Sequence, residues 1–180
     1  MDPALAAQVG EEVADKVLQY RQDGSGWKIC REERSDNFLE AICGVSREPT
    51  LCVTRTATPS AVMNLISPRD FVDLVLVKTY KDGTISSNAA HLEHPSYPPQ
   101  PGYVRGRNHP CGCFCEPVLG EPNKTRVVTF FQTDLSGLLP QSVVDAFFPR
   151  SMAGFYANLQ KALRRTPAPT EGTQDAAPFQ

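Results

Sequence analysis

Phe71-Val72-Asp73-Leu74-Val75-Leu76-Val77 decides the fold, because apolar residues, three of them valine, occupy every position but one. A short run of this composition is typical of a strand, and the nearly continuous apolar pattern indicates burial on both faces. Lys81-Asp82-Gly83 follows as a turn, and a second strand is predicted over 84–94. We therefore expect strand 71–80 and strand 84–94 to form an antiparallel hairpin.

Further strands are predicted on both sides of this hairpin. Residues 51–56 alternate in character, and residues 102–116 and 126–135 are strand-like segments joined by a Pro/Gly turn at 117–124. Strands that are consecutive in sequence are usually neighbours in space. The sequence therefore predicts an antiparallel meander of five strands.

A helix is predicted at each end of the chain. Asp2 and Pro3 suit the N-cap and the first helical position. The apolar stripe that follows is Leu5, Val9, Val13, Val17 and Tyr20, and the helix is expected to end at 23–26. The closing helix is expected to start near Pro140 and to have a kink or break at Pro149. Its apolar face is Val144, Phe148, Phe155, Leu159 and Leu163. The predicted fold class is α+β.

Composition excludes several classes of protein. The chain has 180 residues and a formal net charge of -2, so nothing in its charge favours nucleic acid as a partner. No stretch has the roughly 18 uninterrupted apolar residues of a membrane span, and the first fifteen residues are acidic rather than basic. We expect a cytoplasmic protein with reduced cysteines. Residues 166–180, which are rich in proline, are expected to be a disordered tail.

The cysteines at 111, 113 and 115 are the most prominent chemical cluster, and His109 stands just before them. A spacing of two in a strand places all three thiols on one face, whereas zinc sites usually take cysteines from a turn. Structural thiols are therefore favoured over a metal site, and a thiol enzyme or metal protein is a third-ranked hypothesis. No phosphate loop, HExxH or GxSxG motif is present, so no catalytic residue, metal or cofactor is expected.

A sheet that is apolar on both faces needs a cover other than water. The closing helix can provide it with Phe148 and Phe155. The space between the helix and the sheet can be filled by side chains, as in most small domains, or by a lipid. The residues alone leave both alternatives open.

Several long stretches together resemble the START (StAR-related lipid transfer) domain. They are residues 1–8, 26–31, 65–77, 105–106 with 108–117, and 134–137 continuing into 139–140. The resemblance covers residues 1–31 and about 50–165. It implies a helix-grip fold, in which a curved antiparallel sheet of nine strands wraps around a C-terminal helix and encloses a tunnel for one lipid. It also implies lipid transport without chemistry.

The resemblance implies that the loop Thr58–Arg69 is the family's omega loop, which forms a lid with the C-terminal helix. Through these two segments the protein would make transient contact with a membrane. Val62, Met63, Leu65 and Ile66 suit a lid that meets a bilayer, and the equal alternative is that they are buried anchors of the loop.

Residues 32–49 do not resemble the family, and they stand where it has its first four strands and the two helices between them. The chain is therefore expected to be an internally deleted variant. Its residues 1–165 would form an incomplete START domain that retains about five strands. Loss of the early strands would expose the edge of strand 126–135, which invites aggregation, and would remove one wall of the tunnel. The alternative function is a non-binding, poorly folded remnant or an interaction fragment.

The resemblance also bears on the ligand. Cholesterol carriers of the family place a carboxylate and an arginine in the tunnel where this chain has Thr56 and Val75. Without that ion pair, an oxysterol such as 25-hydroxycholesterol or a bile acid is favoured over cholesterol. The expected ligand-binding residues are Thr56, Asp73, Val75, Ser87, Phe114, Glu116, Phe131, Thr133, Leu135, Phe148, Ser151, Phe155, Leu159 and Leu163.

Overall fold

The structure is a computed structural model that describes residues 2–23, 25 and 51–165. Its elements, in chain order, are α1 (Pro3–Gln22), β1 (Leu51–Thr58), β2 (Arg69–Thr79), β3 (Ile85–His91), β4 (Val104–Arg105), β5 (Arg107–Asn108), β6 (Cys111–Val118), β7 (Glu121–Phe130), β8 (Thr133–Asp134) and α2 (Gln141–Arg165). The expectations for segment 32–49 and for the tail 166–180 lie outside the described residues.

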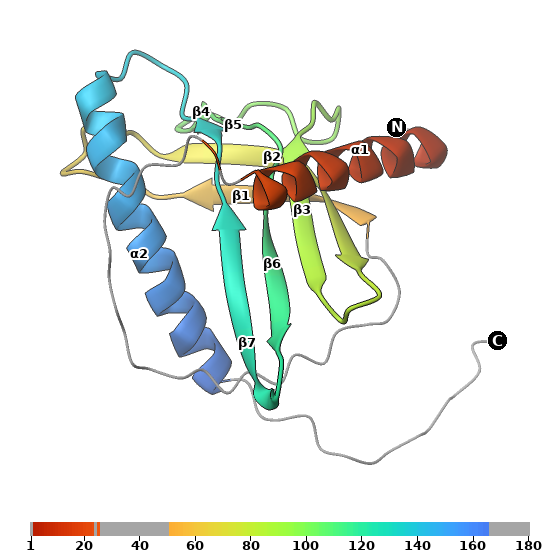
Figure 1. Ribbon diagram of the computed structural model, residues 1–180. Helices are drawn as coiled ribbons and strands as arrows, with labels where there is room; N and C mark the ends of the chain where they lie inside the picture. The colour runs from red at the N-terminus through yellow and green to blue at the C-terminus, as the bar shows by residue number, and fades with distance from the viewer. Residues whose placement is uncertain (1, 24, 26–50, 166–180) are drawn as a thin grey trace.

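The main sheet has the strand order β1-β2-β3-β6-β7, and each neighbouring pair is antiparallel (Figure 1). This order confirms the predicted meander. The hairpin of β2 and β3 is also confirmed, with Tyr80 and Thr84 closing the turn through a 2.8 Å backbone hydrogen bond. Within the described residues β7 has one neighbouring strand, β6, so the outer edge of β7 lies at the end of the sheet.

The single strand predicted over 102–116 is wrong, because the structure divides it into β4, β5 and β6. The backbone of Gly106 passes so close to β2 that an added Cβ would lie 2.3 Å from Cε1 of Phe71. Before this crossing β4 pairs with β2 in parallel, and after it β5 pairs with β8. Pro110, which has no N–H to donate, then separates β5 from β6.

The strand predicted over 126–135 is also displaced. β7 starts at Glu121 and ends at Phe130, because the turn from β6 is shorter than the predicted loop 117–124. Gly120 takes a positive φ of 78° at this turn, a conformation that glycine adopts without steric cost. Residues 133–134 form the separate strand β8.

Helix α1 begins as predicted. The Asp2 carboxylate accepts a hydrogen bond of 3.1 Å from the backbone N–H of Ala4, and Pro3 occupies the first turn. Val13 and Val17 are buried against Phe114 of β6, and together they form one hydrophobic cluster. α1 therefore covers one face of the sheet, which we call the outer face.

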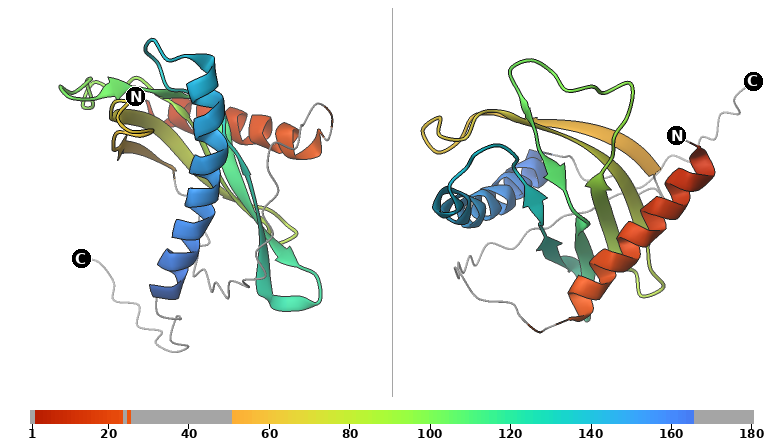
Figure 2. Two further views of the ribbon diagram at one scale, coloured as in Figure 1. Left: turned by 90° about the vertical axis from the view of Figure 1, so that its left-hand side faces the viewer. Right: turned by 90° about the horizontal axis from the view of Figure 1, so that it is seen from above.

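Helix α2 lies on the opposite side of the curved sheet (Figure 2). Its first half joins a second hydrophobic cluster, in which Ile66, Phe71 and Leu135 are buried and Val143, Phe147 and Phe148 pack against them. Pro149 lies inside α2, and the helix is continuous through it, so of the two predicted alternatives, a kink or a break, the break is excluded. None of the helices that the structure describes is long and apolar enough to cross a membrane.

Candidate functional site

The face of the sheet turned towards α2, which we call the inner face, follows from the strand register. Residues that lie directly opposite each other on paired antiparallel strands point to the same side. Two rows cross the sheet in this way. They are Cys52, Val75, Ala89 and Cys111, and Thr54, Asp73 and His91. Thr56 lies opposite Phe71, and Phe71 contacts the α2 cluster, so these rows face α2.

Most of the predicted ligand-binding residues lie on the inner face or on the elements around it. Val75 and Ser87 are half-buried on the inner face, and Thr56 is exposed there. Phe155 of α2 and Phe131, which follows β7, make an edge-to-face contact with ring centroids 5.8 Å apart. The remaining positions are Leu135 and Phe148 in the α2 cluster, Thr133 in β8, Ser151 exposed on α2, and Leu159 and Leu163 half-buried on α2.

Phe114 and Glu116 are exceptions, because the structure places them on the outer face. Phe114 is fully buried under α1, and Glu116 forms an ion pair of 2.8 Å with Arg21 of α1. Side chains alternate along β6, so the thiols at 111, 113 and 115 occupy the inner face and the residues between them cannot. The structure therefore places Phe114 and Glu116 apart from the expected ligand-binding residues of the inner face.

The inner face carries polar groups where β2 and β3 approach β5 and β8. We call Asp73, His91, Asn108 and Thr133 the polar cluster. Thr133 Oγ1 donates to Asn108 Oδ1 at 2.7 Å, and Asn108 Nδ2 donates to Asp73 Oδ2 at 2.8 Å. His91 lies directly opposite Asp73. The sequence predicted Asp73 and Thr133, but Asn108 and His91 were missed, since only the strand register brings them together.

Asp73 is the most unusual member of the polar cluster. Its residue is 6% exposed, and burial raises the pKa of its carboxyl group, while Asn108 and His91 act in the opposite direction. Its second oxygen, Oδ1, is buried and has no hydrogen-bond partner among the described residues, and the same is true of His91 Nδ1. Buried polar atoms are nearly always paired in proteins, so these two atoms indicate a place for a further group.

The three thiols of β6 share the inner face, as the sequence predicted. Burial raises the pKa of the Cys111 thiol to about 12. A hydrogen bond from Cys115 lowers the pKa of Cys113 to about 7, and burial acts against this shift. The described residues contain no group of three or more His, Cys, Asp or Glu side chains that could hold a metal ion.

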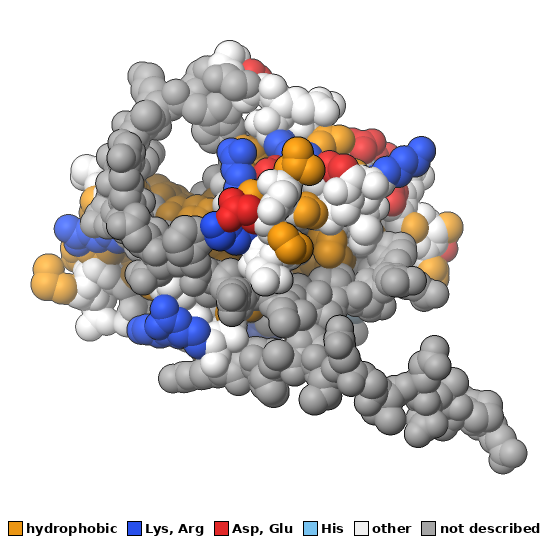
Figure 3. Space-filling view, turned by 60° about the horizontal axis from the view of Figure 1, so that its bottom comes forward, with side chains coloured by type: hydrophobic (Ala, Val, Ile, Leu, Met, Phe, Trp, Pro, Cys, Tyr) orange, Lys and Arg blue, Asp and Glu red, His pale blue; other side chains and the backbone are white. Residues whose placement is uncertain are grey.

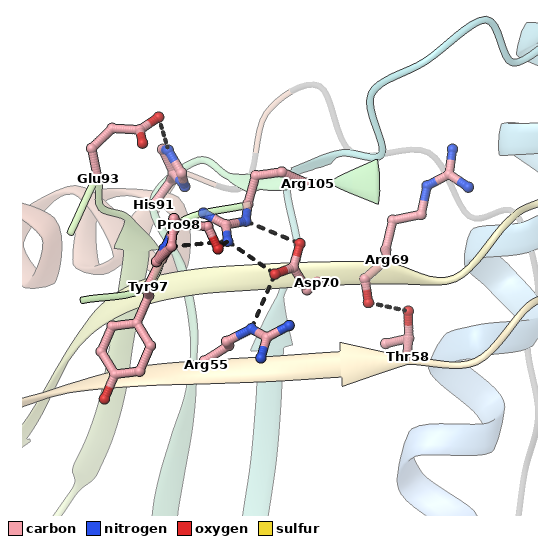
Figure 4. Close-up of polar contacts among 9 residues, drawn as sticks. All are labelled: Arg55, Thr58, Arg69, Asp70, His91, Glu93, Tyr97, Pro98 and Arg105. Carbon is pink, nitrogen blue, oxygen red and sulfur yellow. Dashed lines mark hydrogen bonds and ion pairs between the residues drawn. The ribbon is translucent and has the colours of Figure 1, made fainter. Parts of the chain in front are cut away.

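A buried ion-pair network lies where the loop 59–68 joins β2 (Figure 4). The Asp70 carboxylate, which is fully buried, receives hydrogen bonds from Arg55 at 3.1 Å and from Arg105 at 3.0 and 2.9 Å. Arg105 also donates to the backbone carbonyls of Tyr97 and Pro98. Arg105 and then Arg55 lower the pKa of Asp70. The network fixes β1, β2 and β4 to one another.

Arg69 performs a similar task for α2. Its buried guanidinium donates to the carbonyl oxygens of Leu135, Ser136 and Ser67, at 2.9, 3.0 and 2.6 Å. These bonds join the start of β2 to the segment before α2 and to the end of the loop 59–68. One buried side chain therefore positions both parts of the expected lid.

The loop 59–68 is a tight hairpin closed by two backbone hydrogen bonds between Ala61 and Ile66. Val62, Met63 and Asn64 all have positive φ values, which is strained for residues other than glycine. Met63 is 93% exposed and Leu65 61%, whereas Ile66 is buried in the α2 cluster. The tip of this loop is therefore exposed, and its base is a buried anchor. On the lower side of the molecule, hydrophobic side chains are exposed among charged ones (Figure 3).

Taken together, a curved antiparallel sheet has a long C-terminal helix on its inner side, and polar groups lie buried on that face of the sheet. This is the helix-grip class of ligand-binding fold. A family model described as the START domain matches residues 7–168. The chain belongs to the START domain family.

Its curated relatives include StAR-related lipid transfer protein 5 of Bos taurus, which is 57% identical over 210 residues covering 92% of this chain and 99% of that protein. The Homo sapiens protein of the same name is 56% identical with the same coverage. The solved structure of human StAR-related lipid transfer protein 5 matches with a TM-score of 0.79 and 52% identity, covering 90% of this chain and 98% of that chain.

The length of these alignments agrees with an internally shortened chain. The aligned region spans 210 residues, whereas the whole chain has 180. The relatives therefore contain residues within the matched region that have no counterpart here.

Proposed function

We propose that the protein binds one steroid between the inner face of the sheet and α2 and carries it between membranes. The observation that carries this proposal is the incomplete burial of the apolar groups between these elements. Val75 on the inner face is half-buried, and Phe155 of α2 is exposed. An apolar ligand between them would remove this surface from water, which is the main source of affinity in such sites. The relatives' name, lipid transfer protein, supports the same function.

The ligand is a steroid with polar groups, such as an oxysterol or a bile acid, or cholesterol itself. Thr56 and Val75 are neutral, so a buried arginine–carboxylate pair is absent from these two positions. Polar groups are instead supplied by the polar cluster around Asp73. This combination favours a ligand with hydroxyl groups on an apolar frame over a wholly apolar lipid.

The exposed tip of the loop 59–68 is the part of the protein that meets the membrane. Met63 and Leu65 present apolar side chains to the surroundings, and the base of the same loop packs under α2 through Ile66. Insertion of these two side chains into a bilayer would therefore be linked to the position of α2. We place this exchange in the cytoplasm, and no enzyme activity is proposed.

Titration of the purified full chain with labelled cholic acid and 25-hydroxycholesterol tests the proposal. We expect saturable binding at micromolar protein, and transfer of the bound ligand from donor to acceptor vesicles. The substitution Val75→Glu should weaken binding at least about tenfold, because it buries a second carboxylate beside Asp73 on the inner face.

Leu119→Glu is the matched control, because Leu119 is wholly exposed at the turn between β6 and β7. It should bind as the unchanged chain does. Absence of saturable binding to either steroid by the unchanged chain, or equal binding by both variants, would contradict the proposal. The non-binding alternative predicts the first of these results.

A further inference from the structure

The polar cluster has an excess of hydrogen-bond acceptors. Its hydrogen bonds run in one direction, from the Thr133 hydroxyl to the Asn108 carbonyl and from the Asn108 amide to Asp73 Oδ2. The donors in this series of hydrogen bonds are the Thr133 hydroxyl and one N–H of the Asn108 amide. Asp73 Oδ1 lies at the end of the series and receives no hydrogen bond within the described residues, although it is buried.

His91 adds a second acceptor beside Asp73. Its Nε2 lies 3.2 Å from Glu93 Oε1, and a carboxylate oxygen accepts hydrogen bonds, so this geometry assigns the ring hydrogen to Nε2. In the neutral ring Nδ1 is then an acceptor. This atom is also buried without a partner among the described residues. Because Asp73 and His91 are directly paired across β2 and β3, the two unpaired acceptors belong to one place on the inner face.

We propose that the polar cluster binds a hydroxyl group of the steroid, which donates its one hydrogen to Asp73 Oδ1 beside His91. This inference rests on the proposed function and assigns the polar contact within it. Asp73 Oδ1 and His91 Nδ1 are both buried, so the bound steroid must move the groups that cover them. Asn108 and Thr133 are positioning residues, because they hold the Asp73 carboxylate by its other oxygen.

The direction of these hydrogen bonds determines which ligands are selected. A hydroxyl can donate to Asp73, whereas a ketone oxygen only accepts and would face two further acceptors. The carboxylate of a bile acid would meet like charge at Asp73, so it would lie away from the polar cluster with a ring hydroxyl at the site. The raised pKa of the buried Asp73 carboxyl agrees with an anion that lacks donors, and a ligand hydroxyl would supply one.

The substitution Asp73→Asn gives a sharp test. The oxygen of the new side-chain amide would take over the hydrogen bond from Asn108, and the N–H groups of that amide would then stand where Oδ1 was. The site would change from acceptor to donor with almost no change in shape. Two ligand pairs measure the effect on the full chain, since each differs in hydroxyl donation: cholesterol against cholestenone, and cholic acid against cholanic acid.

We expect the unchanged chain to favour the hydroxylated member of at least one pair by about tenfold, the size of one hydrogen bond to a charged group. Asp73→Asn should abolish that preference, and should favour the ketone cholestenone over cholesterol if the sterol hydroxyl is the group recognised. Asp82→Asn makes the same chemical change at the exposed β2–β3 turn and should leave the preference intact.

Each other outcome has a definite meaning. If the unchanged chain binds both steroids but shows no preference, or if Asp73→Asn keeps the preference, the inference fails and the proposed function stands. If the unchanged chain binds no steroid, both fail. Should Asp73→Asn not fold, nitrogen NMR of the unchanged chain decides the matter, because cholesterol and not cholestenone should shift the His91 Nδ1 signal. Equal shifts with both ligands would overturn the inference.

Discussion

At the scale of single residues, the two buried aspartates of β2 differ in the partners that compensate their charge. Asp70 is fully buried and accepts hydrogen bonds from Arg55 and Arg105. Arg105 also donates to a backbone carbonyl oxygen. Asp73, three positions further along β2, faces the opposite side of the sheet and is held by neutral Asn108 alone. The first carboxylate is therefore structural, whereas the second is left with an unused oxygen.

Asp70→Asn should destabilise the protein by about 3 to 5 kcal/mol at neutral pH, since it leaves two arginines without their buried anion. The pKa of Asp70 is lowered in the folded state, so its contribution is present above the unfolded value near 4 and is lost as the pH falls through the folded value. Urea unfolding at several pH values should show the unchanged chain converging on the variant below about pH 4. A constant difference down to pH 2 would contradict this.

The inner-face thiols should differ sharply in reactivity. The hydrogen bond from Cys115 lowers the pKa of Cys113, whereas burial raises that of Cys111 to about 12. Iodoacetamide should therefore modify Cys113 with a rate that rises through pH 7, and Cys111 should stay unmodified in the folded protein. Mass spectrometry of timed samples measures this.

Cys115→Ala removes the donor and should move the Cys113 profile to higher pH. The control Cys52→Ala changes an exposed thiol on β1 and should leave the profile unchanged. Identical profiles for Cys113 in the unchanged chain and in Cys115→Ala would show that the thiol pair does not set its reactivity.

The candidate site was only partly predictable from sequence at this scale. Alternation placed the thiols at 111, 113 and 115 on one face, and the same alternation excludes Phe114 and Glu116 from it. His91 and Asn108 were not predictable in this way, because they join Asp73 through the register of β2 with β3 and the separate pairing of β5 with β8.

At the scale of elements, β6 depends on the absence of a side chain at Gly112. A Cβ at this position would lie 2.2 Å from the backbone oxygen of Ser87 on β3, and backbone atoms cannot move aside cheaply. Gly112→Ala should therefore cost about 1 to 3 kcal/mol or more by forcing β3 and β6 apart. Thermal and urea unfolding measure the loss.

Gly120→Ala is the comparison, because Gly120 has open space around it and only its positive φ of 78° is at stake. Its cost should be about 1 kcal/mol. Equal losses for the two variants would show that the close contact between β3 and β6 is not what requires glycine at position 112.

The elements themselves were largely predictable. The Asp2-Pro3 start of α1 and the 71–91 hairpin depend on local chemistry, which sequence reports directly. The division of 102–116 depends on the crossing of Gly106 over Phe71, a contact between distant segments that no local pattern records. Likewise, Pro149 is tolerated inside α2, where none of the described side chains is fully buried.

At the scale of the whole molecule, the two helices cover the sheet unequally. Val17 of α1 is fully buried, and this helix seals the outer face with Phe114. α2 packs firmly only through its first half, and further along it Tyr156 donates to Thr129 Oγ1 at 2.8 Å. The inner side of the molecule is therefore the less tightly closed one.

Hydrogen exchange should show that α1 is held to the sheet more tightly than α2. Amides of α2, above all those after Pro149, should exchange faster than the amides of β2 and β3 in the ligand-free chain, because few buried contacts hold the helix. Bound steroid should slow exchange in α2 and leave α1 nearly unchanged. Equal protection of the two helices without ligand would contradict the proposed order of stability.

Arg69 determines which end of α2 is held to the sheet. Because its guanidinium holds the carbonyls of Leu135 and Ser136 to the foot of β2, the beginning of α2 is a fixed pivot. If α2 is held to the sheet at its N-terminal end, its C-terminal end should move most when the helix leaves the sheet. A bound ligand would then leave on the side of Tyr156. The same guanidinium donates to Ser67, so the start of α2 and the end of the exposed loop 59–68 should move together.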